Sequence, residues 1–326
     1  MIITLTLNPG LDRTLTVPRI RFGDVLRATR TRLDWGGKGL NVSRALRAMG
    51  MDSLAMGLVG GATGRMLEFG LAELGIAADM VQIVGETRTN FVVTASGADQ
   101  HIKVNEAGPT VGPQELEALL DRIRQRARSG DVWILSGSLP PGAPPDIYAQ
   151  LIGLVHGAGA KAFLDTSGEP LRLGCTARPF LVKPNAVEAE LMTGQHIESN
   201  ADALDAAGFF LEQGVELVAL SLGAAGLLLM SRQSAVRAFP PEVRVRTPVG
   251  AGDALLAGIT WALEQSLPLE EAARWGVAAG TATAMSEGVH VGSFSEVEAL
   301  YQRTIAETGW SAKAPSVRLD PSFRRK

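Results

Sequence analysis

Short runs of apolar residues alternate along the chain with longer segments in which apolar residues recur every three or four positions. The short runs predict buried strands, and the longer segments predict helices. The predicted strands are Ile2–Leu7, Leu54–Val59, Val132–Ser136, Ala162–Asp165, Phe180–Val182 and Leu217–Ser221. The predicted helices are Leu40–Met49, Gly64–Leu74, Pro113–Arg128, Pro144–His156 and Ala201–Gln213. This order predicts an α/β fold in which helices cover both faces of a mainly parallel sheet.

Two stretches break the alternation, Thr14–Leu33 and Met80–Val104. In the second stretch, two β-like runs, Asn90–Ala95 and His101–Val104, flank the turn residues 96–99. Such spacing is typical of antiparallel strands or hairpins. We therefore predict a small inserted β-subdomain that shares no helices with the main sheet.

The composition limits the partners of this chain. Its 326 residues suffice for one large α/β domain or for a domain with a subdomain. A net charge of −3 gives no general attraction for nucleic acid or an anionic membrane, so we expect a small-molecule partner. The longest uncharged stretch, Leu217–Ser231, is shorter than the roughly 20 residues of a membrane-spanning helix. Residues 314–326 lack periodicity and predict a loose tail.

The cysteine count and the N-terminal residues indicate the cellular compartment of the protein. Cys175 is the single cysteine, so no internal disulfide can form, and the four histidines are too scattered for a local zinc site. The first residues read as a β-branched strand without the basic region of a signal peptide. We expect a cytoplasmic protein.

A glycine turn precedes a helical pattern late in the chain, at Thr247–Asp253. Gly250 and Gly252 would let the backbone approach a ligand closely, and free N–H groups at a helix start attract phosphate oxygens. A carboxylate is unusual beside an anion site. Asp253 is therefore either a helix N-cap or a catalytic base.

A second glycine turn, Trp35–Ala45, also precedes a helical pattern. It places Lys38 and Asn41 near any ligand. Taken alone, however, this turn favours a plain strand-to-helix connection with a solvated Lys38. Gly39 follows Gly37-Lys38 where a P-loop needs Ser or Thr, and G-x-G-x-x-G occurs nowhere. The P-loop and the Rossmann fingerprint are both excluded.

Six motifs spread over nearly the whole chain resemble one known family. They are Thr6–Pro9 with Asp12, Gly36–Gly39 with Asn41, Ser136–Gly142, Lys183–Asn185 with Glu188, Ser221–Gly226, and Gly250–Asp253. Together they resemble the ribokinase-like PfkB sugar kinases. Asn8-Pro9, Glu86–Arg88 and Asn105–Pro109 look most like the branch that contains 1-phosphofructokinase and tagatose-6-phosphate kinase.

The resemblance implies a single kinase domain over residues 1–326, with a three-layer α/β/α ribokinase-like fold. Its central sheet would be mainly parallel. A small β-sheet lid would be formed from about residues 12–34 and 80–106.

The resemblance also implies roles for individual residues. Asp253 would be the base that takes the proton from a sugar hydroxyl. In the catalytic turn that Gly250 opens, the amides of Ala251, Gly252 and Asp253 would form the anion hole. The implied substrate-binding residues are Asp12, Gly36, Gly37, Lys38, Asn41, Arg88, Lys103 and Ser136. The implied nucleotide-binding residues are Lys183, Asn185, Ser221, Gly223 and Gly226.

Magnesium is implied at Asn185 and Glu188, which would hold it through water. These assignments have plainer alternatives. Glu188 could favour a helix dipole, Asp12 could initiate a turn, and Arg88 and Lys103 could be solvated surface groups.

The activity implied by the resemblance is an ATP-dependent phosphosugar kinase that converts fructose 1-phosphate and ATP to fructose 1,6-bisphosphate and ADP. A tagatose-6-phosphate kinase, a 6-phosphofructokinase and a non-catalytic sugar-phosphate sensor are the alternatives. Val25 stands where the family's 6-phosphofructokinases place a basic lid residue, although Arg27 is nearby, which argues against fructose 6-phosphate. The implied partners are ATP, Mg²⁺ and a phosphorylated ketohexose, without nucleic acid or membrane, in a homodimer that pairs through the lid.

Overall fold

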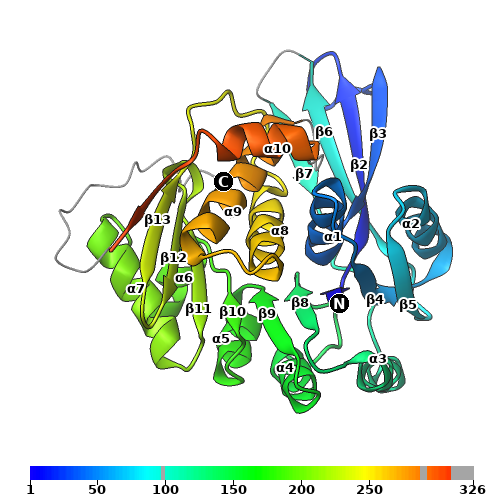
Figure 1. Ribbon diagram of the computed structural model, residues 1–326. Coiled ribbons are helices and arrows are strands. Elements are labelled where there is room, and N and C mark those ends of the chain that lie inside the picture. Colours follow the sequence, from blue (N-terminus) through cyan, green and yellow to red (C-terminus); the bar gives the residue numbers. More distant parts are fainter. Residues whose placement is uncertain (97–99, 287–291, 310–326) are drawn as a thin grey trace.

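The computed structural model describes residues 1–96, 100–286 and 292–309 (Figure 1). The elements of the first half are β1 (Ile2–Thr6), β2 (Gly10–Val17), β3 (Arg30–Gly36), α1 (Lys38–Ala48), β4 (Leu54–Val59), α2 (Gly61–Glu73), β5 (Ala77–Gln82), β6 (Arg88–Ala95), β7 (His101–Val104), α3 (Pro113–Arg126), β8 (Val132–Ser136), α4 (Ile147–Gly157) and β9 (Lys161–Asp165). Those of the second half are α5 (Gly168–Thr176), β10 (Leu181–Val182), α6 (Ala186–Thr193), α7 (Asn200–Glu212), β11 (Leu217–Ser221), the 3₁₀ turn η1 (Gly223–Ala225), β12 (Leu227–Ser231), β13 (Ala235–Phe239), α8 (Ala251–Glu264), α9 (Leu269–Met285), α10 (Phe294–Tyr301) and β14 (Ile305–Thr308).

Within the described residues, ten strands form the main sheet, in the order β14-β13-β12-β11-β10-β9-β8-β1-β4-β5. Strands from β11 to β5 run parallel, and β12, β13 and β14 add an antiparallel edge. In parallel strands the carboxyl ends meet at one edge of the sheet, where α/β proteins bind ligands. Register places Thr6, Ser136 and Asp165 side by side at this edge.

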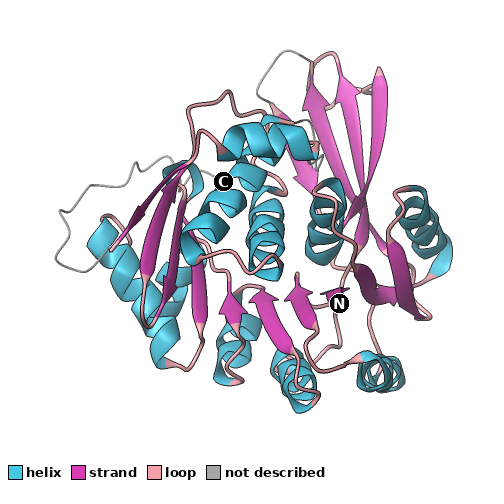
Figure 2. Ribbon diagram, in the orientation of Figure 1, coloured by secondary structure: helices cyan, strands magenta, loops and turns pink. Residues whose placement is uncertain are grey.

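Helices cover both faces of the main sheet (Figure 2). Apolar residues of α3 to α7 pack on one face around the buried Trp133 and Phe210. Residues of α1, α8, α9 and α10 pack on the other face around Ile134 and Phe163. The predicted three-layer α/β/α architecture is confirmed. Among the described residues, no helix is long and apolar enough to cross a membrane.

The four-stranded second sheet has the order β3-β2-β6-β7 and rises beside α1 and α2 in Figure 1. The pairs β2–β3 and β6–β7 are antiparallel, as predicted, but β2 and β6 pair in parallel. Paired residues point to the same face, so Asp12, Asp34 and Asn90 share one face with Lys103. The opposite face is mainly apolar.

The predicted extent of the β-subdomain was wrong at one end. Residues 80–82 belong to β5, which pairs in parallel with β4 at the edge of the main sheet. Met80 and Val81 are buried there, because α2 links β4 and β5 in one more β-α-β unit. The second sheet therefore takes up again only at Arg88. The turn residues 97–99 and the predicted tail 314–326 lie outside the described residues.

Candidate active site

Helix α1 begins at Lys38, directly against the carboxyl ends of β1 and β8. Gly39 permits this close approach, since a Cβ there would lie 2.5 Å from Thr6 Oγ1 and 3.2 Å from Ser136 Oγ. Both hydroxyls are buried and have no hydrogen-bond partner among the described residues. The glycine turn thus places Lys38 and Asn41 at the ligand-binding edge of the main sheet.

Helix α8 begins after Gly250, whose φ of 79° lies in the left-handed region that favours glycine. Gly250 is the N-cap, and no side chain of the described residues caps α8. Asp253 is the third residue of the helix and is buried. The N-cap alternative for Asp253 is therefore wrong. The Ala251 amide donates to the Pro248 carbonyl over 3.2 Å, so of the first amides of α8 those of Gly252 and Asp253 remain for an anion.

The two glycine turns meet through one hydrogen bond. Asn41 Nδ2 donates to Asp253 Oδ2 over 2.8 Å, although the residues lie 212 positions apart in the sequence. The bond orients the carboxylate at the start of α8. The motifs predicted separately at residues 35–45 and 247–253 therefore form one site.

A buried carboxylate, Asp165 at the end of β9, binds two lysines. Lys38 Nζ lies 2.7 Å from Asp165 Oδ1, and Lys183 Nζ lies 3.1 Å from Asp165 Oδ2. Burial alone would raise the pKa of Asp165, but Lys183 and Lys38 outweigh burial and hold it below its usual range. Burial would likewise lower the pKa of Lys38, but Asp165 and Asp253 raise it. Lys38 therefore stays charged beside Asp253.

Asp253 has a pKa raised to about 6. Burial is the main cause and repulsion by Asp165 the second, while Lys38, Asn41 and Lys183 act in the opposite direction. At neutral pH the carboxylate is mostly ionised. It can therefore accept a proton from a bound hydroxyl.

On the second sheet, Asp12 points toward the same region. Asn90 Nδ2 donates to Asp12 Oδ1 over 2.7 Å, and burial raises the pKa of Asp12. Gly36 leaves room for the carboxylate, since a Cβ there would lie 2.6 Å from Asp12 Oδ2. Sequence reasoning missed both Asn90 and Asp165, and only the strand ends and strand register reveal them.

Arg88 begins β6 and is half-buried beside a cavity of about 850 Å³. Its Nη1 donates to the Glu106 carbonyl over 3.1 Å, and its buried Nε has no partner among the described residues. Glu86 does not pair with it, because the Glu86 carboxylate accepts from the Ala62 and Thr63 amides. The guanidinium therefore keeps donors for a ligand. Lys103 lies on the same face of the second sheet and is exposed. Its exposure agrees with the alternative that Lys103 is a solvated surface group.

The predicted nucleotide residues lie together at the ends of β10 and β11. Asn185 and Ser221 form an isolated bridge, and Ser221 N donates to the Pro184 carbonyl. The ammonium of Lys183 also faces the start of α8, since a Cβ on Gly252 would lie 3.4 Å from Lys183 Nζ. The predicted nucleotide-binding residues thus lie next to Asp253.

Asn185 and Glu188 form a capping box at the start of α6. Asn185 Oδ1 accepts from the Glu188 amide, and Glu188 Oε2 accepts from the Asn185 amide. Glu188 therefore acts at a helix start, as its plainer alternative predicted. The capping bond uses Oε2, which leaves the other carboxylate oxygen of Glu188 for a further ligand.

Together the site combines an ionised carboxylate, the buried Lys183, the half-buried Lys38 and two free amides of a helix start. A proton acceptor beside concentrated positive charge is what phosphoryl transfer needs, because positioning and charge neutralisation do most of that catalysis. Half of the site comes from the main sheet and half from the second sheet.

Comparison with known proteins agrees with this geometry. Residues 6–294 match the pfkB family carbohydrate kinase. The 1-phosphofructokinase of Xanthomonas campestris pv. campestris is 37% identical over 83% of this chain and 87% of its own length. The ATP-dependent 6-phosphofructokinase isozyme 2 of Mycobacterium tuberculosis is 33% identical over 92% of this chain and 89% of its own.

A solved structure shares the fold as well. The phosphofructokinase-2 of Escherichia coli, in complex with potassium, superposes with a TM-score of 0.89 at 31% identity, over 93% of this chain and 98% of that one. The resemblance found in the motifs thus extends to the whole described fold. This chain belongs to the pfkB family of carbohydrate kinases.

Proposed function

We propose that this protein is an ATP-dependent phosphosugar kinase that transfers the γ-phosphoryl group of ATP to O6 of fructose 1-phosphate. The observation that carries the proposal is the Asn41–Asp253 hydrogen bond, which unites a sugar-side turn and an anion-binding helix start. The similarity to the Xanthomonas 1-phosphofructokinase supports the substrate.

In this mechanism Asp253 accepts the proton of the attacking sugar hydroxyl while the new P–O bond forms and the bond to ADP breaks. Lys38, Lys183 and the amides of Gly252 and Asp253 neutralise the charge on the transferred group. The pKa of about 6 leaves Asp253 ionised at neutral pH, which suits a base.

On the sugar side, Asp12 and Asn41 bind hydroxyl groups, and Gly36 and Gly37 let the ring come close. Arg88 binds the phosphate that the substrate already carries, because a guanidinium can hold two phosphate oxygens at once. The unpaired Nε of Arg88 supports this role.

The nucleotide binds over Lys183, Asn185 and the Ser221–Gly226 turn. Mg²⁺ fits beside it, since Glu188 keeps one carboxylate oxygen and Mg²⁺ takes oxygen ligands while keeping several waters. Bound there with ATP, Mg²⁺ would neutralise charge on the β- and γ-phosphates. We place the enzyme in the cytoplasm.

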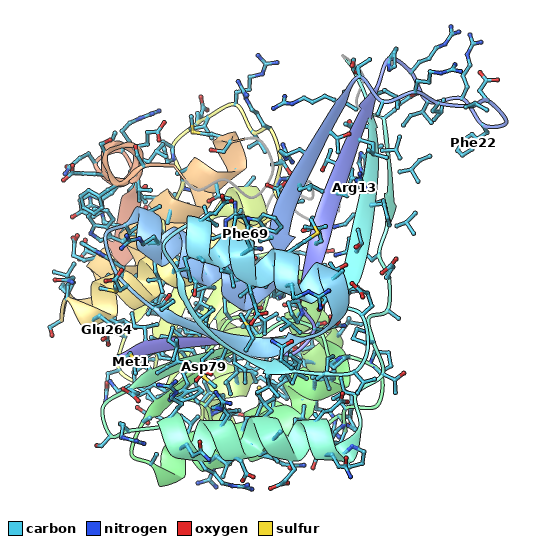
Figure 3. The ribbon with its side chains drawn as sticks, turned by 90° about the vertical axis from the view of Figure 1, so that its right-hand side faces the viewer. Met1, Arg13, Phe22, Phe69, Asp79 and Glu264 are labelled. Carbon is cyan, nitrogen blue, oxygen red and sulfur yellow. The ribbon has the colours of Figure 1, made fainter. Side chains whose placement is uncertain are left out.

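We further propose that the second sheet is a lid and that its outer face pairs with a second copy. Leu33 and Val104 on that face, and Met66 and Phe69 on neighbouring α2, are exposed apolar groups. Figure 3 shows where Phe69 lies. A few-stranded sheet with an exposed apolar face is poorly stable alone. Sedimentation at micromolar concentration should show a dimer, and Leu33→Asp should shift it toward the monomer. A monomeric parent would contradict the pairing.

The deciding experiment is ADP release with fructose 1-phosphate, tagatose 6-phosphate, fructose 6-phosphate and free fructose as acceptors. The proposal expects the highest kcat/KM with fructose 1-phosphate. A preference for fructose 6-phosphate would align the chain with its Mycobacterium relative instead. Binding of sugar phosphate without ADP release would indicate a sensor.

A further inference from the structure

A fully buried arginine lies outside the catalytic group described above. Arg237 in β13 is 1% exposed. Its Nη2 donates to the Ala225 carbonyl over 3.0 Å, and its guanidinium carbon lies 4.9 Å from the centre of the Phe239 ring. Nε and Nη1 have no hydrogen-bond partner among the described residues. Burying a charged guanidinium whose N–H donors lack partners lowers the stability of the fold. The burial of Arg237 at this position therefore needs an explanation.

Neighbouring charges do not supply that explanation. Register places Arg237 between Leu228 on β12 and Glu307 on β14. Glu307 is an exposed residue of the edge strand β14, and within the described part of the chain the one hydrogen bond of the Arg237 guanidinium goes to Ala225. Burial lowers the pKa of Arg237 to about 10, against the opposing effect of Glu307, so the group stays charged at neutral pH. The Ala225 carbonyl is the polar partner that remains.

The Ala225 bond holds the turn between β11 and β12. Leu222 N donates to the Gly226 carbonyl over 2.8 Å and closes the turn. Gly226, with φ of 87°, rests on β13, since a Cβ there would lie 2.0 Å from the Ala238 carbonyl. Two consecutive residues of β13, Arg237 and Ala238, therefore determine where this turn lies.

We propose that Arg237 is a positioning residue of the nucleotide site, which holds the Gly223–Gly226 turn in its binding conformation through the Ala225 carbonyl. The inference rests on the proposed function in that the nucleotide binds at this turn. It explains why a guanidinium occupies a position where an apolar side chain of similar volume would be neutral or stabilising.

The test compares Arg237→Met and Arg237→Lys with a matched control, Arg232→Met. Arg232 also donates from a guanidinium to a backbone carbonyl, that of Leu211, but at the opposite end of the β12–β13 hairpin. The measurements are the Kd of ADP by calorimetry, the KM of ATP and of fructose 1-phosphate, and the Tm.

For Arg237→Met we expect about a ten-fold weaker Kd for ADP, close to 1.4 kcal/mol, with a similar rise in the KM of ATP. The KM of fructose 1-phosphate should stay within about two-fold, and the Tm should be unchanged or higher. Arg237→Lys should recover part of the loss, since an ammonium can still donate to a carbonyl. Arg232→Met should leave ADP binding at the parent value.

A merely structural role predicts another result, namely a lower Tm and equal rises in both KM values. That outcome, or an unchanged Kd for ADP in a folded Arg237→Met, would overturn the inference. If Arg237→Met fails to fold, Arg237→Lys decides by the same Kd. The ADP arm needs no sugar, so failure of the proposed acceptor would show in the parent's kinetics and leave this test intact.

Discussion

The half of the site on the main sheet and the half on the second sheet differ in how far their side chains are positioned before a ligand binds. On the main sheet, Asp165 and Lys183 are 0% and 5% exposed and paired, and Asp253 is held by Asn41. On the second sheet, Arg88 keeps a free donor and Lys103 is exposed. Catalysis needs fixed geometry, whereas recognition of a charged substrate needs donors that are still available. The chemistry is thus preorganised and the specificity is left open.

The largest effect should come from the preorganised half. Asp253→Asn removes the proton acceptor but keeps the bond from Asn41 possible, so kcat should fall by roughly 10²–10⁴ while both KM values change little. Steady-state kinetics measure this. Asp202→Asn is the control, because Asp202 is likewise the third residue of a helix, α7, but lies in a capping box. A kcat of Asp253→Asn within a few-fold of the parent would remove Asp253 from the chemistry.

Substitutions in the half of the site on the second sheet should change KM instead of kcat. Arg88→Ala should raise the KM of fructose 1-phosphate by roughly ten-fold or more, at about 1.4 kcal/mol per decade, with a smaller effect on ATP. Arg88→Lys should recover only part, since a point charge cannot make a planar two-point contact. Lys103→Ala, on the same face, serves as the exposed control and should change KM little. An equal rise of both KM values for Arg88→Ala would contradict the phosphate assignment.

Two glycine substitutions sharpen the contrast in rigidity. Gly39→Ala pushes a methyl group against Thr6 and the Leu5 carbonyl of the main sheet, and should lower the free energy of unfolding by about 1–3 kcal/mol. Gly36→Ala meets only the carboxylate end of Asp12, a side chain that can rotate. It should raise the sugar-phosphate KM with a smaller loss of stability. Urea denaturation with kinetics checks both, and the reverse pattern would refute the contrast.

The smallest expected effect is the change of kcat with pH. Below its pKa of about 6, Asp253 binds a proton and can no longer accept one, so kcat should be about half its plateau at pH 6 and fall further below. Asn41→Ala is the diagnostic variant. It removes a bond that lowers this pKa, so the acid limb should move to higher pH. A limb that stays in place would belong to the substrate phosphate, whose second pKa is also about 6.

Local patterns in the sequence determined much of this molecule. Every predicted strand is present, because apolar runs of strand length must be buried. The two glycine turns were recognised because glycines before a helical pattern let the backbone approach a ligand closely, and the motif set led to the family. The helix α9 was not predicted, because its Ala- and Gly-rich sequence carries little periodicity.

Tertiary structure alone decided which side chains meet. Asn41 and Asp253 are 212 residues apart, and Lys38 and Asp165 are 127 apart, so no local pattern contains either contact. Strand order assigned residues 80–82 to the main sheet and put Asn90 beside Asp12. The physical reason is that periodicity reports only whether a residue is buried. Strand pairing and helix packing, set by the sum of distant contacts, decide what it is buried against.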